Sequence, residues 1–277
     1  MMHFDQIFPD NRETGETRLK QCQLVMLRML KILDYLCNKY DIQYFLTGGS
    51  LLGAVRHQGF IPWDDDLDVG MTRENYEKFV EYAVPQLPKD IFFQNRETDP
   101  HYPYIEMVEA RLRDKYSSYA TSNNKFHEGL QVDIFVYDCS FFSNRFLIIV
   151  ENIILGLLSS DRRRAQVLKW IEKYSPFSHV YASSYLQNLG MLKRLGTYKT
   201  REEISRLIRT PFEDMEVYIP TGWDKFLKRQ YGNYMKLPPV EAQMGHHSKD
   251  LPDPFVPCNH KDILYWKEKP QEKSYLS

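Results

Sequence analysis

The sequence lacks the cysteine pattern of a disulfide-stapled or zinc-bound protein. Its four cysteines, Cys22, Cys37, Cys139 and Cys258, are scattered, with no C-x-x-C pair and no cysteine–histidine ligand spacing. Disulfide frameworks and structural zinc sites depend on such spacings. We therefore expect reduced thiols and a reducing compartment.

Targeting signals are absent as well. The first residues, MMHFDQIFPDNRETGE, lack the basic start and apolar core of a secretory signal peptide, and no Asn-x-Ser/Thr acceptor occurs anywhere. Both observations favour a cytoplasmic location.

A strong net charge is missing too. The 36 Lys and Arg residues nearly balance the 37 Asp and Glu residues, so the net charge is -1. No global field then attracts nucleic acid, which we exclude as a partner. With 277 residues, 43% of them hydrophobic, the chain can bury a sizeable core. Any charged substrate has to be held by local groups.

Long hydrophobic runs are also lacking. The most apolar stretch, FLIIVENIILGLL at 146–158, is interrupted by Glu151 and Asn152 and is too short to span a bilayer. Asp161 and three arginines follow it. One interpretation is a buried helix with a solvated basic end. The other is a surface over 146–164 that rests on anionic lipid, at the inner face of the cytoplasmic membrane.

Hydrophobic periodicity divides the first third of the chain into clear elements. Apolar residues at three- and four-residue spacing predict a helix over 17–40. A strand over 42–47, a tight glycine turn, a short helix over 50–57 and a strand over 66–71 follow. Thr72 could cap a helix that runs to about Val84.

The rest of the chain mixes strands and helices without regular alternation. Strands are predicted at 91–95, 104–114, 115–121 and 130–138. The pattern at 141–209 is helical, with a Thr200–Glu203 capping box before ISRLIR. A strand at 215–218, a helix at 221–230 and a Pro-rich tail from Leu237 that wraps or frays complete the prediction.

This order favours an α+β fold over a doubly wound sheet. We expect a catalytic core at 1–140, a helical insertion at 141–212 and a C-terminal segment at 213–277 that packs back on the core. The three together would form one structural domain.

Four aspartates crowd into the segment IPWDDDLDVGM. In an extended strand Asp66 and Asp68 point the same way while Leu67 points into the core, and Asp64 shares their face if the strand begins early. Neighbouring carboxylates repel unless a cation or a proton lies between them. Oxygen ligands of this kind suit Mg²⁺ or Mn²⁺.

A third carboxylate comes from the apolar strand LQVDIFVYD. Asp133 stands between apolar neighbours, where an uncompensated charge is expensive, whereas Asp138 at the strand end resembles an ordinary turn residue. We therefore choose Asp133 as the third member of the site.

A glycine turn precedes the aspartates. Gly48, Gly49 and Ser50 lie between a strand and an apolar helix, where backbone N–H groups and a hydroxyl can reach a phosphate. Together with D-x-D on the next strand, this turn suits a nucleotide diphosphate with its metal. The alternative is a simple tight turn followed by a solvated acidic loop.

The stretch FLTGGSLLGAVRHQGFIPWDDDLDVGM, at 45–71, closely resembles the signature of the LicD/fukutin family, and YGNYMKLPPVEAQMGHH resembles its C-terminal segment. The resemblance covers roughly 24–247. It implies a nucleotidyltransferase-like mixed β-sheet core flanked by helices. The residues that match the family pattern are Gly48, Gly49 and Ser50 for phosphate, Asp66, Asp68 and Asp133 for metal and catalysis, and Arg56, Trp63 and His246.

The resemblance also implies a reaction. A CDP-activated alcohol, most often CDP-choline, would give its phospho-alcohol group to a sugar hydroxyl of a cell-surface glycan, such as lipopolysaccharide, teichoic acid or capsule, or of a lipid-linked precursor. CMP would leave, a divalent metal held by Asp66 and Asp68 would offset charge on the diphosphate, and Asp133 could take the acceptor proton.

Two other functions stay open. The same carboxylates could serve nucleotidyl transfer from an NTP with release of pyrophosphate. The chain could also be a scaffold that has lost its metal site, although the three carboxylates argue against this.

Three further residues have two interpretations each. Arg56 could clamp a phosphate or pair with the acidic loop. Trp63 could stack on a base or face a quaternary ammonium, or belong to the core. His246 could contact phosphate or act as an acid, or lie on the surface.

Overall fold

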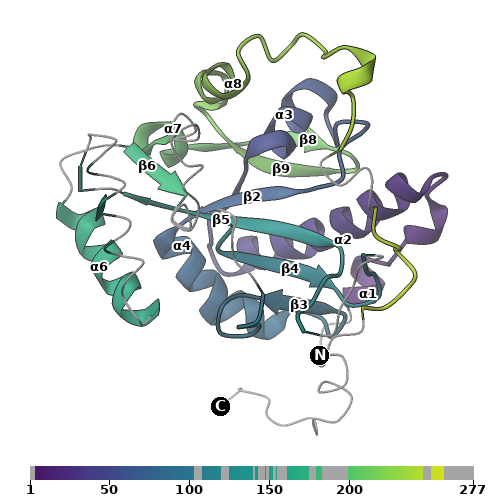
Figure 1. The fold of residues 1–277 in the computed structure, drawn as a ribbon, viewed down its shortest axis with the longest axis horizontal. Helices are drawn as coiled ribbons and strands as arrows, with labels where there is room; N and C mark the ends of the chain where they lie inside the picture. Colours follow the sequence, from purple (N-terminus) through teal and green to yellow (C-terminus); the bar gives the residue numbers. More distant parts are fainter. Residues whose placement is uncertain are drawn as a thin grey trace, which may run out of the picture.

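The fold is given by a computed structural model (Figure 1), which describes residues 4–102, 108–119, 125–139, 141–142, 147, 150–151, 154, 161–174, 179–182, 199–245 and 251–258.

A mixed β-sheet forms the centre of the described molecule (Figure 1). Five strands follow one another in space: β1 (Phe45–Leu46), β2 (Asp68–Thr72), β5 (Gln131–Cys139), β4 (Ala110–Asp114) and β3 (Ile91–Gln94). β2 and β5 run parallel, and the other pairs are antiparallel. Two short strands, β6 (His179–Ala182) and β7 (Lys199–Thr200), extend the sheet from the far end of β5. The predicted α+β class is confirmed.

The two faces of this sheet differ in chemistry. Alternation along the strands sends Val69, Val132 and Ile134 into the apolar core, together with the long helix α2 (Arg18–Lys39). The helix α4 (Arg73–Lys78), continued by a π-turn (Phe79–Ala83) and a 3-10 turn (Val84–Gln86), covers the same side (Figure 1). The opposite face carries Asp68 and Asp133, and the candidate site lies there.

A second layer lies beside β1 and β2. The helix α3 (Gly48–His57) packs with the hairpin of β8 (Leu207–Phe212) and β9 (Met215–Pro220), where the rings of Phe60 and Phe212 are 5.1 Å apart. The short helix α7 (Arg201–Ser205) precedes this hairpin and α8 (Trp223–Tyr231) follows it. From α8 the chain passes over α3 (Figure 1) through a 3-10 turn (Val240–Ala242).

The C-terminal residues return to the beginning of the chain. Asp253 pairs with Ser118 through two backbone hydrogen bonds of 2.7 and 3.0 Å. Arg12, in a 3-10 turn (Arg12–Thr14) after the short helix α1 (Phe4–Ile7), contacts the carbonyl of Pro254 and forms an ion pair of 2.8 Å with Asp114. The described part of the tail wraps around the core.

Several predicted elements are confirmed with their caps. Thr17 caps α2 by accepting a hydrogen bond from the Lys20 amide, and Thr72 caps α4 by accepting one from Asn75. The strand predicted over 42–47 is only the two residues of β1, which pair with Gly70 and Val69 of β2. Gly48 and Gly49 are the first turn of a helix, where the sequence analysis expected a separate tight turn.

Two other predictions are wrong. Residues 115–118 form a turn with one isolated bridge at Ser118, although a strand was expected. The helix predicted through ISRLIR stops at Ser205, and 207–212 is strand β8. The physical reason is tertiary: pairing with β9 buries Phe212, Val217 and Ile219, which outweighs the local helix signal.

The region 141–212 is therefore only partly helical. It contains α6 (Asp161–Tyr174) and α7, but it also contributes the strands β6, β7 and β8. Most of the suggested membrane surface at 146–164 lies outside the described residues. In the described part of the chain, no helix is both long and apolar enough to cross a bilayer. The three segment boundaries remain a prediction.

Candidate active site

The aspartate run approaches β2 as an extended chain with alternating exposure. Asp64, Asp66 and Asp68 are partly exposed, whereas Asp65 and Leu67 are buried. This is the two-residue period of a strand, and it begins four residues before β2. Three carboxylates therefore share one face, and Asp65 turns to the other.

The first turn of α3 lies directly against two of these carboxylates. Gly48 has a φ of 56°, and a Cβ at this position would lie 2.7 Å from Asp68 Oδ2. A Cβ at Gly49 would lie 3.0 Å from Asp64 Oδ2. Because glycine has no Cβ, the two carboxylates can approach the backbone of α3 at these positions. They lie at the N-terminal end of the helix, where free N–H groups and the helix dipole favour negative charge.

Hydrogen bonds lock α3 to the start of β2. The Asp68 amide donates to Ser50 Oγ at 2.8 Å, and the Thr47 amide donates to the Asp68 carbonyl at 3.2 Å. The Thr47 hydroxyl also bonds the Tyr137 hydroxyl of β5 at 2.9 Å. Ser50, predicted as a phosphate contact, thus positions the backbone of Asp68.

Asp133 lies beside Asp68 on the neighbouring parallel strand, and the two residues are register partners. Its amide donates to the Leu67 carbonyl at 2.8 Å. Asp133 is 6% exposed, and its Oδ1 lies 2.9 Å from Arg111 Nε. Arg111 is its register partner on β4, 1% exposed, with its guanidinium 4.6 Å from the centre of the Tyr102 ring. Sequence reasoning missed this arginine because the β4–β5 register brings it there.

Asp138, on the same strand, has a different environment. Both of its oxygens accept hydrogen bonds from Arg73, at 2.6 and 3.0 Å, and Arg73 also lies 3.3 Å from Glu109. The residue is 7% exposed. Asp138 is therefore part of a buried ion pair that ties α4 to β5, and the expectation of an ordinary turn residue is wrong.

The buried Asp65 contacts the C-terminal segment. A Cβ at Gly245 would overlap the Asp65 carboxylate, because it would lie 2.5 Å from the carboxyl carbon Cγ. Asp65 is 4% exposed. The side chain of Gln23, on α2, donates to the Asp64 carbonyl at 2.9 Å. The acidic run is thus held from both sides, by α2 and by the chain around Gly245.

Tyr231 is a residue that sequence reasoning did not connect with the aspartates. It is the last residue of α8 and is 41% exposed. Partial burial and the negative charges of Asp68, Asp64 and Asp66 raise the pKa of Tyr231. Its hydroxyl accepts a hydrogen bond of 3.1 Å from Gln230 Nε2. In the sequence, Tyr231 begins YGNYM, part of the stretch that resembles the C-terminal segment of the LicD/fukutin family. Nothing in the sequence connected this stretch to the aspartates.

Arg56 connects α3 to the segment after α8. Its Nη1 donates to the Tyr234 carbonyl at 2.8 Å, and its Nε donates to His57 Nε2 at 2.9 Å. Burial lowers the pKa of Arg56, and the nearby charges of Asp64 and Tyr231 act in the opposite direction. Burial and the charge of Arg56 lower the pKa of His57.

The last two predicted residues are less central. Trp63 is half-buried against the core, and its ring meets His57 edge-on with centroids 6.2 Å apart. This agrees with its interpretation as a core residue. His246 lies outside the described residues.

No three His, Cys, Asp or Glu side chains of the described residues come together as a complete metal site. Mg²⁺, however, is commonly bound by one or two carboxylates together with substrate phosphates. Asp64 and Asp68 converge on adjacent residues of α3, and Asp66 shares their face. This set of oxygen donors fits a cation that arrives with a diphosphate.

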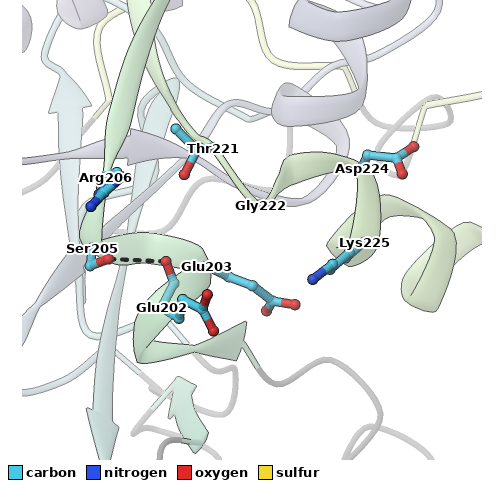
Figure 2. A pocket seen from close by; sticks show the side chains of 8 residues that line it. All are labelled: Glu202, Glu203, Ser205, Arg206, Thr221, Gly222, Asp224 and Lys225. Carbon is cyan, nitrogen blue, oxygen red and sulfur yellow. Dashed lines mark hydrogen bonds between the residues drawn. The ribbon is translucent and has the colours of Figure 1, made fainter.

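A hollow of about 630 Å³ lies away from the aspartates, between α7, the end of β9 and the start of α8 (Figure 2). Its lining consists of Glu202, Glu203, Ser205, Arg206, Thr221, Gly222, Asp224 and Lys225. Glu203 forms an ion pair of 2.9 Å with Arg229. The hollow is at the opposite end of α8 from Tyr231: its lining residue Lys225 lies six residues before Tyr231, about 9 Å along the helix axis at 1.5 Å per residue. It contains none of the predicted site residues.

The fold and the site define an α+β protein in which a glycine-started helix and two parallel strands bring carboxylates together. The family model described as "LicD/FKTN/FKRP, nucleotidyltransferase domain" matches residues 41–152, which include all of the predicted site residues except His246. The chain belongs to the LicD family.

Two relatives support this membership to different extents. The lipopolysaccharide cholinephosphotransferase LicD of Haemophilus influenzae is 30% identical over 269 residues, which covers 84% of this chain and 97% of that protein. The ribitol 5-phosphate transferase FKRP of Homo sapiens is 56% identical over 34 residues, which are 12% of this chain and 7% of that protein.

Proposed function

We propose that this protein is a metal-dependent phosphotransferase, which moves a phospho-alcohol group from a CDP-alcohol to a sugar hydroxyl of a cell-surface glycan or its lipid-linked precursor. Phosphocholine from CDP-choline is the group we favour, because the relative that covers most of the chain is named a lipopolysaccharide cholinephosphotransferase. The observation that carries the proposal is the carboxylate row of Asp64, Asp66 and Asp68 set against the first turn of α3.

In this proposal each carboxylate has a distinct environment. Asp66 and Asp68 would hold Mg²⁺ or Mn²⁺, which when bound neutralises charge on the diphosphate. The first turn of α3 lies against Asp68 and Asp64, at the helix end where the dipole favours negative charge. Ser50 fixes the backbone of Asp68, so the carboxylate keeps its direction.

The acceptor hydroxyl would attack the phosphorus that bears the alcohol, and the bond to the bridging oxygen would break with CMP as the leaving group. Asp133 is a weaker candidate for the acceptor proton than its sequence suggested. Its Oδ1 already has a cationic partner, because Arg111 Nε lies 2.9 Å away. We assign Asp133 a positioning role beside Asp68, paired with Arg111, and the proton to Asp64, the partly exposed carboxylate that is not assigned to the metal.

Asp68→Asn tests the proposal, since it keeps the shape of the side chain and removes its charge. With Mg²⁺, we expect CDP-choline, CDP-ethanolamine or CDP-ribitol to raise the Tm by several degrees at about 100 times its Kd, equal to roughly 2.7 kcal/mol. EDTA should abolish the shift. The wild type should then release CMP from the donor that shifts it, and Asp68→Asn should release it at least about 100-fold more slowly with its own Tm preserved.

Asp214→Asn is the matched control. Asp214 forms an ion pair of 2.6 Å with Lys31, its side chain is 67% exposed, and it lies in the hairpin turn. This variant should keep wild-type turnover. A shift with ATP alone and release of pyrophosphate would replace the proposal by nucleotidyl transfer. Full activity in Asp68→Asn would refute the assignment of the site.

A further inference from the structure

A row of three charged residues crosses the sheet at the candidate site. Asp68, Asp133 and Arg111 are register partners on β2, β5 and β4, which lie side by side (Figure 1). Register partners project from the same face of a sheet and lie within reach of one another. Asp133 therefore has a second carboxylate on one side and a guanidinium on the other.

Both carboxylate oxygens of Asp133 have partners within the protein. Its Oδ1 forms the ion pair of 2.9 Å with Arg111 Nε, and its Oδ2 accepts a long hydrogen bond of 3.5 Å from Gln131 Nε2. The carbonyl oxygen of the Gln131 side chain in turn accepts a hydrogen bond from Arg113. The negative charge of Asp133 is thus compensated by a guanidinium, without a metal ion.

Packing fixes Arg111 beside Asp133. The guanidinium lies 4.6 Å from the centre of the Tyr102 ring, and the guanidinium of Arg113 lies 5.4 Å from the same ring. Arg111 and Asp133 are both buried. If the two side chains separated, each would become an uncompensated charge in a buried place, which is strongly unfavourable. We therefore expect the ion pair to persist when a cation binds nearby.

This arrangement limits the number of cations that the site can hold. A divalent cation with Asp133 as a ligand would lie next to the guanidinium of Arg111, and like charges repel strongly where water screens them little. Asp66 and Asp68 differ from Asp133 because they are partly exposed. They are accessible to a cation that keeps several of its waters, as Mg²⁺ usually does.

We propose that Arg111 takes the place of a second cation, so that the site binds one divalent cation, held by Asp66 and Asp68, and Asp133 is a positioning residue. The inference rests on the proposed function in that the carboxylate row receives a cation. It departs from the role of metal ligand that the family resemblance implied for Asp133. A second cation is the usual companion of the first in two-metal sites, and here a buried arginine replaces it.

Counting bound Mn²⁺ tests this inference without a donor or an acceptor. Electron paramagnetic resonance of free Mn²⁺ gives the number of ions bound per chain, and we expect one in the wild type. Arg111→Met leaves Asp68 and Asp133 as neighbouring carboxylates that need a cation, so we expect it to bind a second Mn²⁺. Its Tm should be lower than that of the wild type in EDTA and should recover in part with Mn²⁺.

Two further variants guard against a loss of folding and an unspecific effect. Arg111→Met/Asp133→Asn removes both charges of the pair, and it should bind one Mn²⁺ with a Kd within about threefold of wild type, because the net charge is unchanged. Arg209→Met is the matched control. It releases Asp34 of α2 from an ion pair of 2.7 Å outside the row, and it should bind one Mn²⁺ like the wild type.

The outcomes separate this inference from the proposed function. Two Mn²⁺ in the wild type, or only one in a folded Arg111→Met, would overturn the role of Arg111. A loss of Mn²⁺ affinity of about tenfold or more in the double variant would make Asp133 a metal ligand and would overturn it as well. Release of CMP from a CDP-alcohol would leave the phosphotransferase proposal standing in each case. The expected Mn²⁺ counts in a protein that releases CMP from no CDP-alcohol would support the inference and refute the donor.

Discussion

The two chain segments that meet at the site are built in different ways. In the front segment, residues 45–72, the decisive contacts are local: the Ser50 hydroxyl and the Asp68 amide are 18 residues apart. In the C-terminal segment, residues 223–245, they are remote: Arg56 and the Tyr234 carbonyl are 178 residues apart. One segment shapes the carboxylate row through its own strand–helix–strand pattern, and the other is brought to it by single contacts.

This difference shows how such a site divides its tasks. The front segment supplies charge, because alternation and a glycine-started helix are enough to align Asp64, Asp66 and Asp68. The C-terminal segment supplies a contact with the buried Asp65 through Gly245. We therefore expect changes in the front segment to damage chemistry most, and changes in the C-terminal segment to damage the placement of its residues.

Gly48→Ala, compared with Gly232→Ala, tests this difference with the largest expected effect. Both glycines have positive φ, 56° and 65°, so alanine strains either backbone by about 1–3 kcal/mol. At Gly48 the new Cβ also meets Asp68 Oδ2 at 2.7 Å, whereas nothing lies within 4 Å of one at Gly232. We expect both variants to lose similar stability in urea titrations, but Gly48→Ala to lose at least about 100-fold in CMP release, because small displacements of reacting groups are costly. Equal activity in the two variants would contradict this account.

Sequence patterns located the aspartates of the front segment, but they did not locate the contacts of the C-terminal one. The run Asp64–Asp68 could be placed because strand alternation has a period of two, and Asp133 because a charge between Val132 and Ile134 needs a compensating partner. The identity of that partner, Arg111, follows from β4–β5 register, which is a tertiary property. Tyr231 and Gly245 depend on how a distant helix docks, and ISRLIR carried a helix signal that strand pairing overrode.

Gly245→Ala tests the docking of the C-terminal segment and should have an intermediate effect. A methyl group there would overlap the buried Asp65 carboxylate, so we expect overpacking to lower the free energy of unfolding by about 1–3 kcal/mol. Activity should fall less than in Gly48→Ala, because Asp68 is not displaced. Chemical denaturation measures the change in stability.

A double-mutant cycle shows whether the collision with Asp65 is the cause. In an Asp65→Ala background the carboxylate is gone, so Gly245→Ala should cost at most half of the stability that it costs in the wild type, with a coupling free energy of about 1 kcal/mol. Additive effects would mean that Gly245 is needed for another reason, and the contact between the two segments would lose its assigned importance.

Arg56→Met tests the link between the segments and should have the smallest effect. The variant loses one hydrogen bond to the Tyr234 carbonyl, worth about 1 kcal/mol, and keeps most of the side chain's apolar length. Hydrogen exchange of the amides at 232–236 should accelerate severalfold, while affinity for pyrophosphate with Mg²⁺ should fall only two- to threefold. Lys236→Met, at an exposed position in the same segment, should leave both unchanged. A loss of pyrophosphate affinity of tenfold or more with unchanged exchange would instead make Arg56 the phosphate clamp that its sequence position suggested, and the C-terminal segment would then be held by contacts other than this one.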